Sequence, residues 1–213
     1  MTGQVRTVDG RVAGRRGQET RQKLLDCLRE MLSTSPYRDV KVIDVARMAG
    51  TSPATFYQYF PDVEGAVLEI AEEMAEDSVE LKQLVDGKSW AGKTGFTTSE
   101  DLVEGFLAFW RKNDAILRVV TLGAAEGDKR FFKIRMKVLN SVAGPLAEAI
   151  SANQGKTDRS VDASGLSGAL VSLLASAAEH TKAFTSWGVK AKDLKPTLAL
   201  QIYLGVTGKK PPK

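Results

Sequence analysis

The sequence predicts an all-α fold of about nine helices. Apolar residues recur at intervals of three and four along most of the 213-residue chain, which is the period of a helix with one buried face. No stretch of any length alternates apolar and polar residues as a half-buried strand would. Glycine, proline and paired Asn and Asp residues separate the apolar segments, and these residues mark helix ends.

The first sixteen residues are polar and contain four arginines, so we expect residues 1–16 to form a disordered basic arm. The first helix is expected from about Gln18 to Ser33, with leucines and a methionine along its buried side. Pro36 stops this helix, because the residue before a proline avoids the helical region.

Two short helices joined by a tight turn are predicted over residues 42–60. In the first of them, Val45, Ala46 and Ala49 share one face. Gly50 ends this helix, since glycine enters the left-handed conformation without steric cost.

The second short helix has clear start signals. Ser52 suits the N-cap, and Pro53 suits the first helical position, where no N–H is needed. Phe56 and Phe60 lie four residues apart and are expected to point inward. The outward residues are Ser52, Ala54, Thr55, Tyr57, Gln58 and Tyr59. This layout is typical of a helix-turn-helix whose second helix enters a DNA major groove.

The same stretch resembles the DNA-binding signature of TetR-type transcriptional regulators, roughly V-x-D-[IV]-A-x-x-A-G-[VT]-S-x-[GA]-T-[FL]-Y-x-[YH]-F. The matching residues are Val42, Asp44, Val45, Ala46, Ala49, Gly50, Ser52, Ala54, Thr55, Phe56, Tyr57, Tyr59 and Phe60. The resemblance covers residues 17–70 and implies an N-terminal DNA-binding domain followed by a helical ligand-binding and dimerisation domain. Where the family usually has a phosphate-contacting lysine, this chain has Val63.

Roles on DNA follow from position and from the resemblance. Gln58 can pair bidentately with adenine, and the residues at the start of the second helix face the groove floor. The resemblance gives Tyr57 and Tyr59 contacts to phosphates or base edges, and Lys41 is expected on a phosphate. The predicted DNA-binding residues are Arg15, Arg16, Lys41, Ser52, Pro53, Ala54, Thr55, Tyr57, Gln58 and Tyr59.

The charge distribution favours the same end of the chain. Residues 1–60 hold ten Lys and Arg against six Asp and Glu, which accounts for the whole net charge of +4. The basic arm is either a solvated tail or a segment that lies on DNA phosphates or in a minor groove.

The remaining boundaries are set by polar breaks in the apolar pattern. We expect a DNA-binding domain over 17–61, a regulatory and dimerisation domain over 62–208 and a disordered tail over 209–213. The expected helices of the second domain are one connector over 62–85, one that follows a cap at Thr97–Ser99, one after Asn113-Asp114, and three over 129–151, 161–187 and 194–206.

The segment Gly87–Thr94, GKSWAGKT, satisfies the phosphate-binding pattern G-x-x-x-x-G-K-[ST]. That loop works between a buried strand and a helix, whereas an acidic helix is expected before this segment. We therefore interpret residues 86–98 as a flexible connection, and a nucleotide-binding enzyme stays a minor alternative.

Large apolar side chains on the inward faces of the second domain could line a cavity for a small hydrophobic effector, or they could fill a core. The candidates are Phe106, Phe109, Trp110, Met136, Phe184 and Trp187.

A regulator of this kind needs two reading heads about one helical turn of DNA apart, and therefore a homodimer on a palindromic operator. The candidate interface residues are Leu166, Leu170, Leu173, Leu174, Ala177, Leu198 and Ile202, on the two C-terminal helices.

The sequence thus predicts a cytoplasmic DNA-binding repressor that a hydrophobic effector releases. An effector-independent DNA-binding dimer is the main alternative. With one cysteine, Cys27, and one histidine, His180, we expect no metal, cofactor or catalytic site. No apolar run predicts a signal peptide or a membrane contact, since the longest stretch, 165–178, is too short to span a bilayer.

Overall fold

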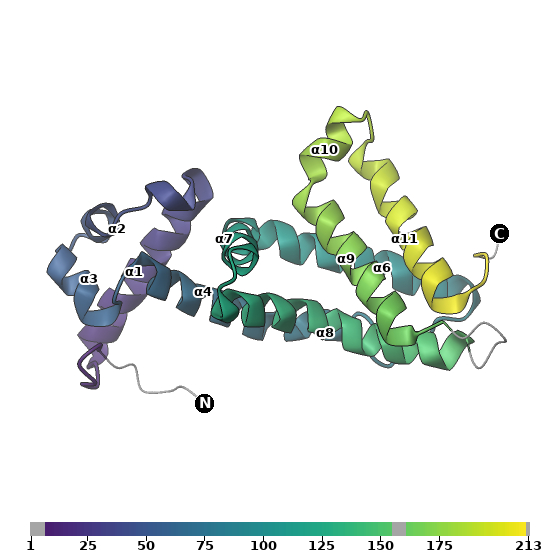
Figure 1. The fold of residues 1–213 in the computed structure, drawn as a ribbon, viewed down its shortest axis with the longest axis horizontal. Coiled ribbons are helices and arrows are strands. Elements are labelled where there is room, and N and C mark those ends of the chain that lie inside the picture. Colours follow the sequence, from purple (N-terminus) through teal and green to yellow (C-terminus); the bar gives the residue numbers. More distant parts are fainter. Residues whose placement is uncertain (1–6, 155–160, 212–213) are drawn as a thin grey trace. The chain divides into compact units, whose positions relative to one another are not determined.

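The computed structural model describes residues 7–154 and 161–211, and the regular elements in these residues are helices. They divide into two compact units. The first unit runs up to Met74 and also includes Ala115–Ile134. The second contains Ala75–Asp114 and the chain from Arg135 onward. The predicted all-α fold with an N-terminal helix-turn-helix and a helical C-terminal domain is confirmed (Figure 1).

The first unit is built on its N-terminal helix. Its elements are α1 (Arg15–Thr34), the 3₁₀ turn η1 (Tyr37–Asp39), α2 (Val42–Met48), α3 (Pro53–Tyr59), most of α4 (Val63–Asp77), α7 (Asp114–Ala125) and the start of α8 (Lys129–Gln154). Helices α2 and α3 pack on each other and on α1 (Figure 1). The leucines of the apolar stripe of α1 are buried, with Leu24, Leu25 and Leu28 at 0% exposure, whereas Met31 is half-buried.

The second unit is organised around one long helix, α6 (Gly92–Lys112). Helices α9 (Ala163–Glu179) and α11 (Ala191–Thr207) both pack against α6 and against each other (Figure 1). The other elements are α5 (Val79–Lys82), α10 (Thr181–Ser186) and the rest of α8. The Ser167 hydroxyl donates to the carbonyl of Ala143 at 2.6 Å, which fixes α9 on α8.

Two expected helices are each divided, so the described residues hold eleven α-helices where about nine were predicted. The connector expected over 62–85 begins as predicted, with the Gly65 N–H donating to the Asp62 carboxylate at 2.7 Å, but α4 ends at Asp77. The buried Ser78 hydroxyl donates to the carbonyl of Ala75, and such bonds compete with helix continuation. The helix expected over 161–187 is divided at His180, whose backbone is not helical.

The expected flexible connection over 86–98 is wrong for its second half, because α6 begins at Gly92. The Thr98 and Ser99 hydroxyls bond to carbonyls within α6 instead of capping it. Trp90 is 4% exposed, and a Cβ at Gly95 would lie 2.1 Å from the Trp90 carbonyl oxygen. Glycine is therefore required at residue 95 for the chain before α6 to pack on it.

The disordered arm predicted over residues 1–16 is wrong for its described part. Residues 7–12 form a closed turn, and α1 begins at Arg15, three residues before the predicted start. The turn is held because its backbone bonds to α3, a contact that composition cannot reveal. The first six residues of the arm, 155–160 of the predicted polar loop and the last two of the predicted tail lie outside the described residues.

Candidate nucleic-acid interface

The start of α3 is fixed by the turn that precedes it. Gly50 has a φ of +69°, and the Thr51 N–H donates to the Ala46 carbonyl at 2.9 Å. Ser52 is the N-cap, since its hydroxyl accepts from the Thr55 N–H at 3.2 Å, and Pro53 occupies the first turn. The helix boundaries and cap predicted for residues 42–60 are therefore correct to within one residue.

The inner side of α3 fixes its rotation about its own axis. Phe56 and Phe60 are both 0% exposed, and their ring centroids lie 5.3 Å apart. The guanidinium of Arg21 on α1 lies 5.2 Å from the Phe60 ring centroid and forms an ion pair with Glu69 on α4. This anchoring determines which side chains of α3 face outward.

The outward side of α3 carries most of the residues predicted to read DNA. Ser52, Pro53, Ala54 and Gln58 are exposed, and Tyr57 is 52% exposed. Amide, hydroxyl and small apolar groups are those that contact base edges in a major groove. The helix therefore presents a narrow polar surface from a rigid support.

Thr55 and Tyr59 are half-buried and also support the fold. The Thr55 hydroxyl lies 3.0 Å from the Ser52 hydroxyl, within the cap. The Tyr59 hydroxyl lies 3.1 Å from the position that a Cβ at Gly17 would take, so this ring packs beside the start of α1. These two side chains are placed by contacts within the unit as well as by any role on DNA.

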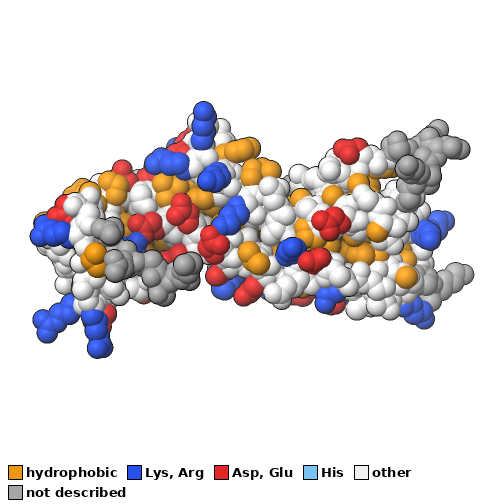
Figure 2. All heavy atoms as spheres, turned by 90° about the horizontal axis from the view of Figure 1, so that it is seen from below, with side chains coloured by type: hydrophobic (Ala, Val, Ile, Leu, Met, Phe, Trp, Pro, Cys, Tyr) orange, Lys and Arg blue, Asp and Glu red, His pale blue; other side chains and the backbone are white. Residues whose placement is uncertain are grey.

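The predicted phosphate-contacting cations are exposed. Lys41 lies at the start of α2 and Arg16 at the start of α1. Arg15, one residue earlier, pairs with Glu19 through Nε at 3.0 Å. Figure 2 shows Lys and Arg side chains projecting from the surface of the first unit. Long-range attraction to phosphate does not require these charges to be buried.

Hollows flank both sides of Tyr57. One, of about 670 Å³, is lined by Lys41, Ile43, Pro53 and Val63 among others, so Val63 lies close to the start of α3. The other, of about 530 Å³, lies between Gln58 and the turn of residues 7–12. Sequence reasoning missed this turn as a neighbour of α3, although an Asp-Gly pair, at residues 9 and 10, is a turn signal.

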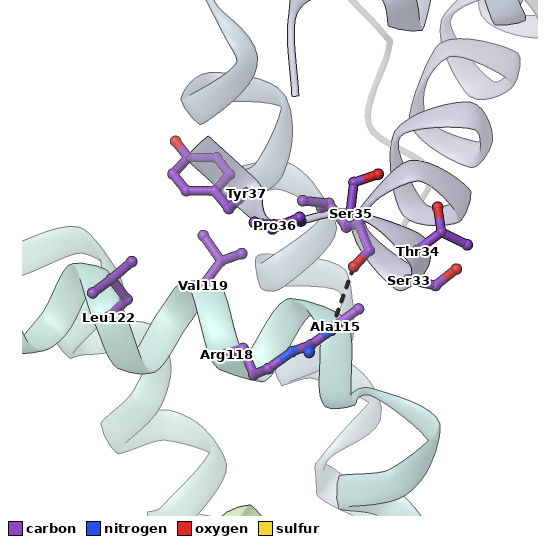
Figure 3. Close-up of a pocket in the computed structure, with 10 residues that line it drawn as sticks. Ser33, Thr34, Ser35, Pro36, Tyr37, Ala115, Arg118, Val119 and Leu122 are labelled. Atoms are coloured by element: carbon purple, nitrogen blue, oxygen red, sulfur yellow. Dashed lines mark hydrogen bonds between the residues drawn. The ribbon is translucent and has the colours of Figure 1, made fainter. Parts of the chain in front are cut away.

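A third hollow of the first unit, of about 380 Å³, lies between the end of α1 and α7 (Figure 3). Its lining includes Leu32, Tyr37, Val119 and Leu122, and Arg118 donates to the Leu32 carbonyl at 3.4 Å. None of the six residues predicted to line an effector cavity contributes to these three hollows.

The six predicted effector residues form two separate aromatic pairs and two single side chains, Phe109 and Met136. Phe106 and Trp110 are stacked at 5.0 Å and are buried, at 0% and 2% exposure. Phe184 and Trp187 form an edge-on pair, but Trp187 is 72% exposed. The prediction that Trp187 lines a cavity is wrong for a single chain, because the short α10 turns it outward. Phe109, Met136 and Phe184 are half-buried.

Most of the predicted dimer residues belong to the core of their own chain. Leu170, Leu174, Ala177, Leu198 and Ile202 are all below 9% exposure, and the interface prediction is wrong for them. They face α6 and its neighbours, because both sides of α9 and α11 carry apolar or small residues and the more apolar side is turned inward. Leu173 is 40% exposed and Leu166 is half-buried.

The P-loop-like segment Gly87–Thr94 runs from the residues that follow α5 into the first turn of α6. Lys93 and Thr94 belong to the first turn of α6, and the residues before Gly87 follow a helix and not a strand. This geometry differs from the strand-to-helix turn that gathers backbone N–H groups around phosphates. In the described part of the chain, no helix has the length and apolarity to cross a bilayer.

Helix α3 is exposed and packs on α1 and α2, and a larger set of helices follows it in the chain. This arrangement is that of a helix-turn-helix transcriptional regulator that binds DNA. The comparisons agree with this class. The family model described as bacterial regulatory proteins, tetR family, matches residues 24–70. The model described as tetracyclin repressor-like, C-terminal domain, matches residues 81–213. This chain belongs to the TetR family.

The similar proteins are distant in sequence. The nucleoid occlusion factor SlmA of Shewanella frigidimarina is 29% identical over 121 residues, which is 56% of this chain and 59% of that protein. The fatty acid degradation regulator FadR from Bacillus halodurans has a TM-score of 0.65 at 16% identity, over 95% of this chain and 100% of that one. Thermus thermophilus FadR, a TetR family repressor in complex with lauroyl-CoA, has a TM-score of 0.56 at 17% identity, over 91% and 96%.

Proposed function

We propose that this chain is a homodimeric repressor that binds a palindromic operator and is released by a small hydrophobic effector. The observation that carries the proposal is the exposed polar side of α3, held by the buried Phe56 and Phe60. A helix capped and anchored in this way can enter a major groove without rearranging. Gln58 is proposed to read a base pair, and Lys41 and Arg16 to contact phosphates.

The outer side of α9 and α11 supports dimerisation. On α9, the exposed residues follow one face and are mostly small, namely Ser164, Gly165, Gly168, Ala169, Ser172, Leu173 and Ser176. On α11, which packs beside α9, Leu200 and Leu204 are half-buried at helical spacing. Small side chains let a second helix approach closely. A two-fold axis through this surface would bring the same two helices of each chain together.

The proposed effector site is the interior of the second unit beside α6. Phe109 and Met136 are half-buried there, on α6 and α8. The stacked Phe106 and Trp110 form part of the core, so the effector would occupy space beside them. A protein of the same fold, Thermus thermophilus FadR, is described with lauroyl-CoA, which makes an acyl ligand a reasonable first probe. Coupling free energies between two allosteric sites are typically about 1–3 kcal/mol, which would suffice to release the DNA.

Selection of duplexes from random DNA by the full chain tests the proposal. The expected result is an enriched palindrome whose half-sites lie about one helical turn apart, or a multiple of it, bound by two chains. Absence of any enriched sequence would contradict the reading role of α3.

The effector is tested separately by thermal unfolding with acyl ligands. A ligand at about one hundred times its dissociation constant adds about 2.7 kcal/mol to the free energy of unfolding. If operator binding is sequence-specific and no hydrophobic compound raises the melting temperature or weakens the complex, the chain acts as an effector-independent dimer.

A further inference from the structure

The turn of residues 7–12 is attached to the reading helix. The Val8 N–H donates to the carbonyl oxygen of Gln58 at 2.8 Å, and the side chains of Tyr57 and Gln58 border the hollow between turn and helix. At its other end the turn is fixed to α1, since Ala13 is buried and its carbonyl accepts from Gln18 Nε2 at 3.2 Å. The turn therefore lies at a defined place beside α3.

The turn is closed by its own hydrogen bonds. The Thr7 N–H donates to the Arg11 carbonyl at 2.9 Å, and the Gly10 N–H donates to the Thr7 carbonyl at 2.8 Å. Gly10 has a φ of +84°, a conformation that side chains with a branched Cβ avoid. The Asp9 carboxylate accepts from the Thr7 hydroxyl and from Arg11 Nε, the latter at 2.7 Å. The turn thus fixes the stem of Arg11 without burying its charge.

Arg11 projects from this turn into solvent. Its side chain is 84% exposed, and the pair with Asp9 engages Nε and Nη2. A guanidinium carries five N–H donors, so the outer edge of Arg11 can still donate to an oxygen anion. Guanidinium donors match both carboxylate and phosphate oxygens, and phosphates are the anions that a DNA duplex offers.

The width of the groove identifies what Arg11 meets. A helix with its side chains is about 10–12 Å across, and the major groove is about 12 Å wide. A reading helix therefore fills the groove, and a segment seated at its side lies over one of the flanking strands. Because the turn bonds to Gln58, near the end of α3, this strand is the one that borders the later half of the helix.

We propose that the turn of residues 7–12 is a second DNA-contacting element, in which Arg11 binds a backbone phosphate flanking the groove that α3 reads. Asp9 and Gly10 are positioning residues, because they hold the turn that presents Arg11. The inference rests on the proposed DNA binding through α3, and it adds a contact from outside the helix-turn-helix.

The test uses the full chain and two duplexes, namely the operator recovered by selection and a random duplex of equal length. Arg11→Ala is expected to weaken binding to both by roughly three- to tenfold at moderate salt. It should also reduce the slope of log affinity against log salt by about 0.9 per chain. The matched control is Arg111→Ala, which removes an exposed arginine at the end of α6 and should leave affinity and slope unchanged.

A second variant separates the turn from the charge. Gly10→Val keeps every charge but disfavours the left-handed residue that the turn requires. It should weaken binding nearly as much as Arg11→Ala, and the double variant should be no worse than either one. Melting temperatures should match the wild type, since the turn is exposed. Additive losses would show that the turn does not present Arg11.

The outcomes separate this inference from the proposed function. If the wild type selects an operator and Arg11→Ala binds it with unchanged affinity and salt slope, the phosphate contact is refuted while the reading role of α3 stands. If Arg11→Ala changes the preferred base pairs, Arg11 lies on base edges and the phosphate assignment is overturned. If the wild type selects no sequence, the proposed function itself fails.

Discussion

Replacing Gln58 by alanine removes one proposed base contact without disturbing the fold of the first unit. The side chain is exposed, and the bond that Gln58 makes to Val8 uses its backbone carbonyl, which alanine retains. A bidentate contact between an amide and a base pair is worth about 1–3 kcal/mol of discrimination. A symmetric dimer carries two such contacts, so the operator should lose about 2–6 kcal/mol in all.

Fluorescence anisotropy on three duplexes measures this loss. The duplexes are the selected operator, one with the candidate base pair changed in one half-site, and one with it changed in both. The wild type should lose about 1–3 kcal/mol per changed half-site, whereas Gln58→Ala should bind all three with nearly equal affinity. Gln83→Ala, an exposed glutamine of the second unit, is the matched control. If Gln58→Ala still discriminates as the wild type does, Gln58 reads no base.

Three further predictions concern charge, assembly and acid stability. Lys41→Ala should weaken binding to all duplexes alike and lower the salt slope by about 0.9 per chain, as salt titrations will show. Leu174→Ala should lower the free energy of unfolding by about 2–5 kcal/mol, because Leu174 is fully buried. Leu173 is exposed, so Leu173→Ala should leave folding intact and weaken the dimer, as measured by analytical ultracentrifugation. A hydrogen bond from Arg130 lowers the pKa of Asp128 from 3.8 to about 2, so the stability that Asp128 contributes is present above about pH 4 and is lost as the pH falls through about 2. Denaturant titrations at several pH values should therefore show a smaller loss for Arg130→Ala than for the wild type over this range, and an equal loss would contradict the pairing.

The helix-turn-helix could be predicted in detail because its signals are local. Gly50 supplies the left-handed residue, Ser52 the cap and Pro53 the first turn, and each acts on its immediate neighbours. The inward pair Phe56 and Phe60 follows from helical spacing alone. Exposure of Gln58 is then a consequence of the same geometry.

The second unit could be predicted less well from the sequence, because the contacts that determine its helix ends and buried faces are long-range. Helix α9 carries apolar or small residues on both sides, so the sequence could not tell that Leu170 and Leu174 face inward while Leu173 faces out. The breaks at Ser78 and His180 lack proline or glycine, which are the usual stop signals. They depend on packing and on side-chain bonds to the backbone, which sequence patterns do not reveal.

The N-terminal turn shows the same limit. Asp9 and Gly10 form a turn signal, but composition favoured disorder because the segment is polar and lies at the end of the chain. What holds the turn is a bond between residues 8 and 58, fifty positions apart. These two residues come together only when the first unit is folded.

Site-directed cleavage of DNA tests most directly whether α3 lies in the major groove. An iron chelate would be tethered to Ala54→Cys, an exposed position on α3, in a Cys27→Ala background, with Lys112→Cys on α6 as the control. Cleavage is expected at the centre of each half-site from residue 54, and none is expected from residue 112. Operator binding without any cleavage from residue 54 would contradict the placement of α3 in the major groove.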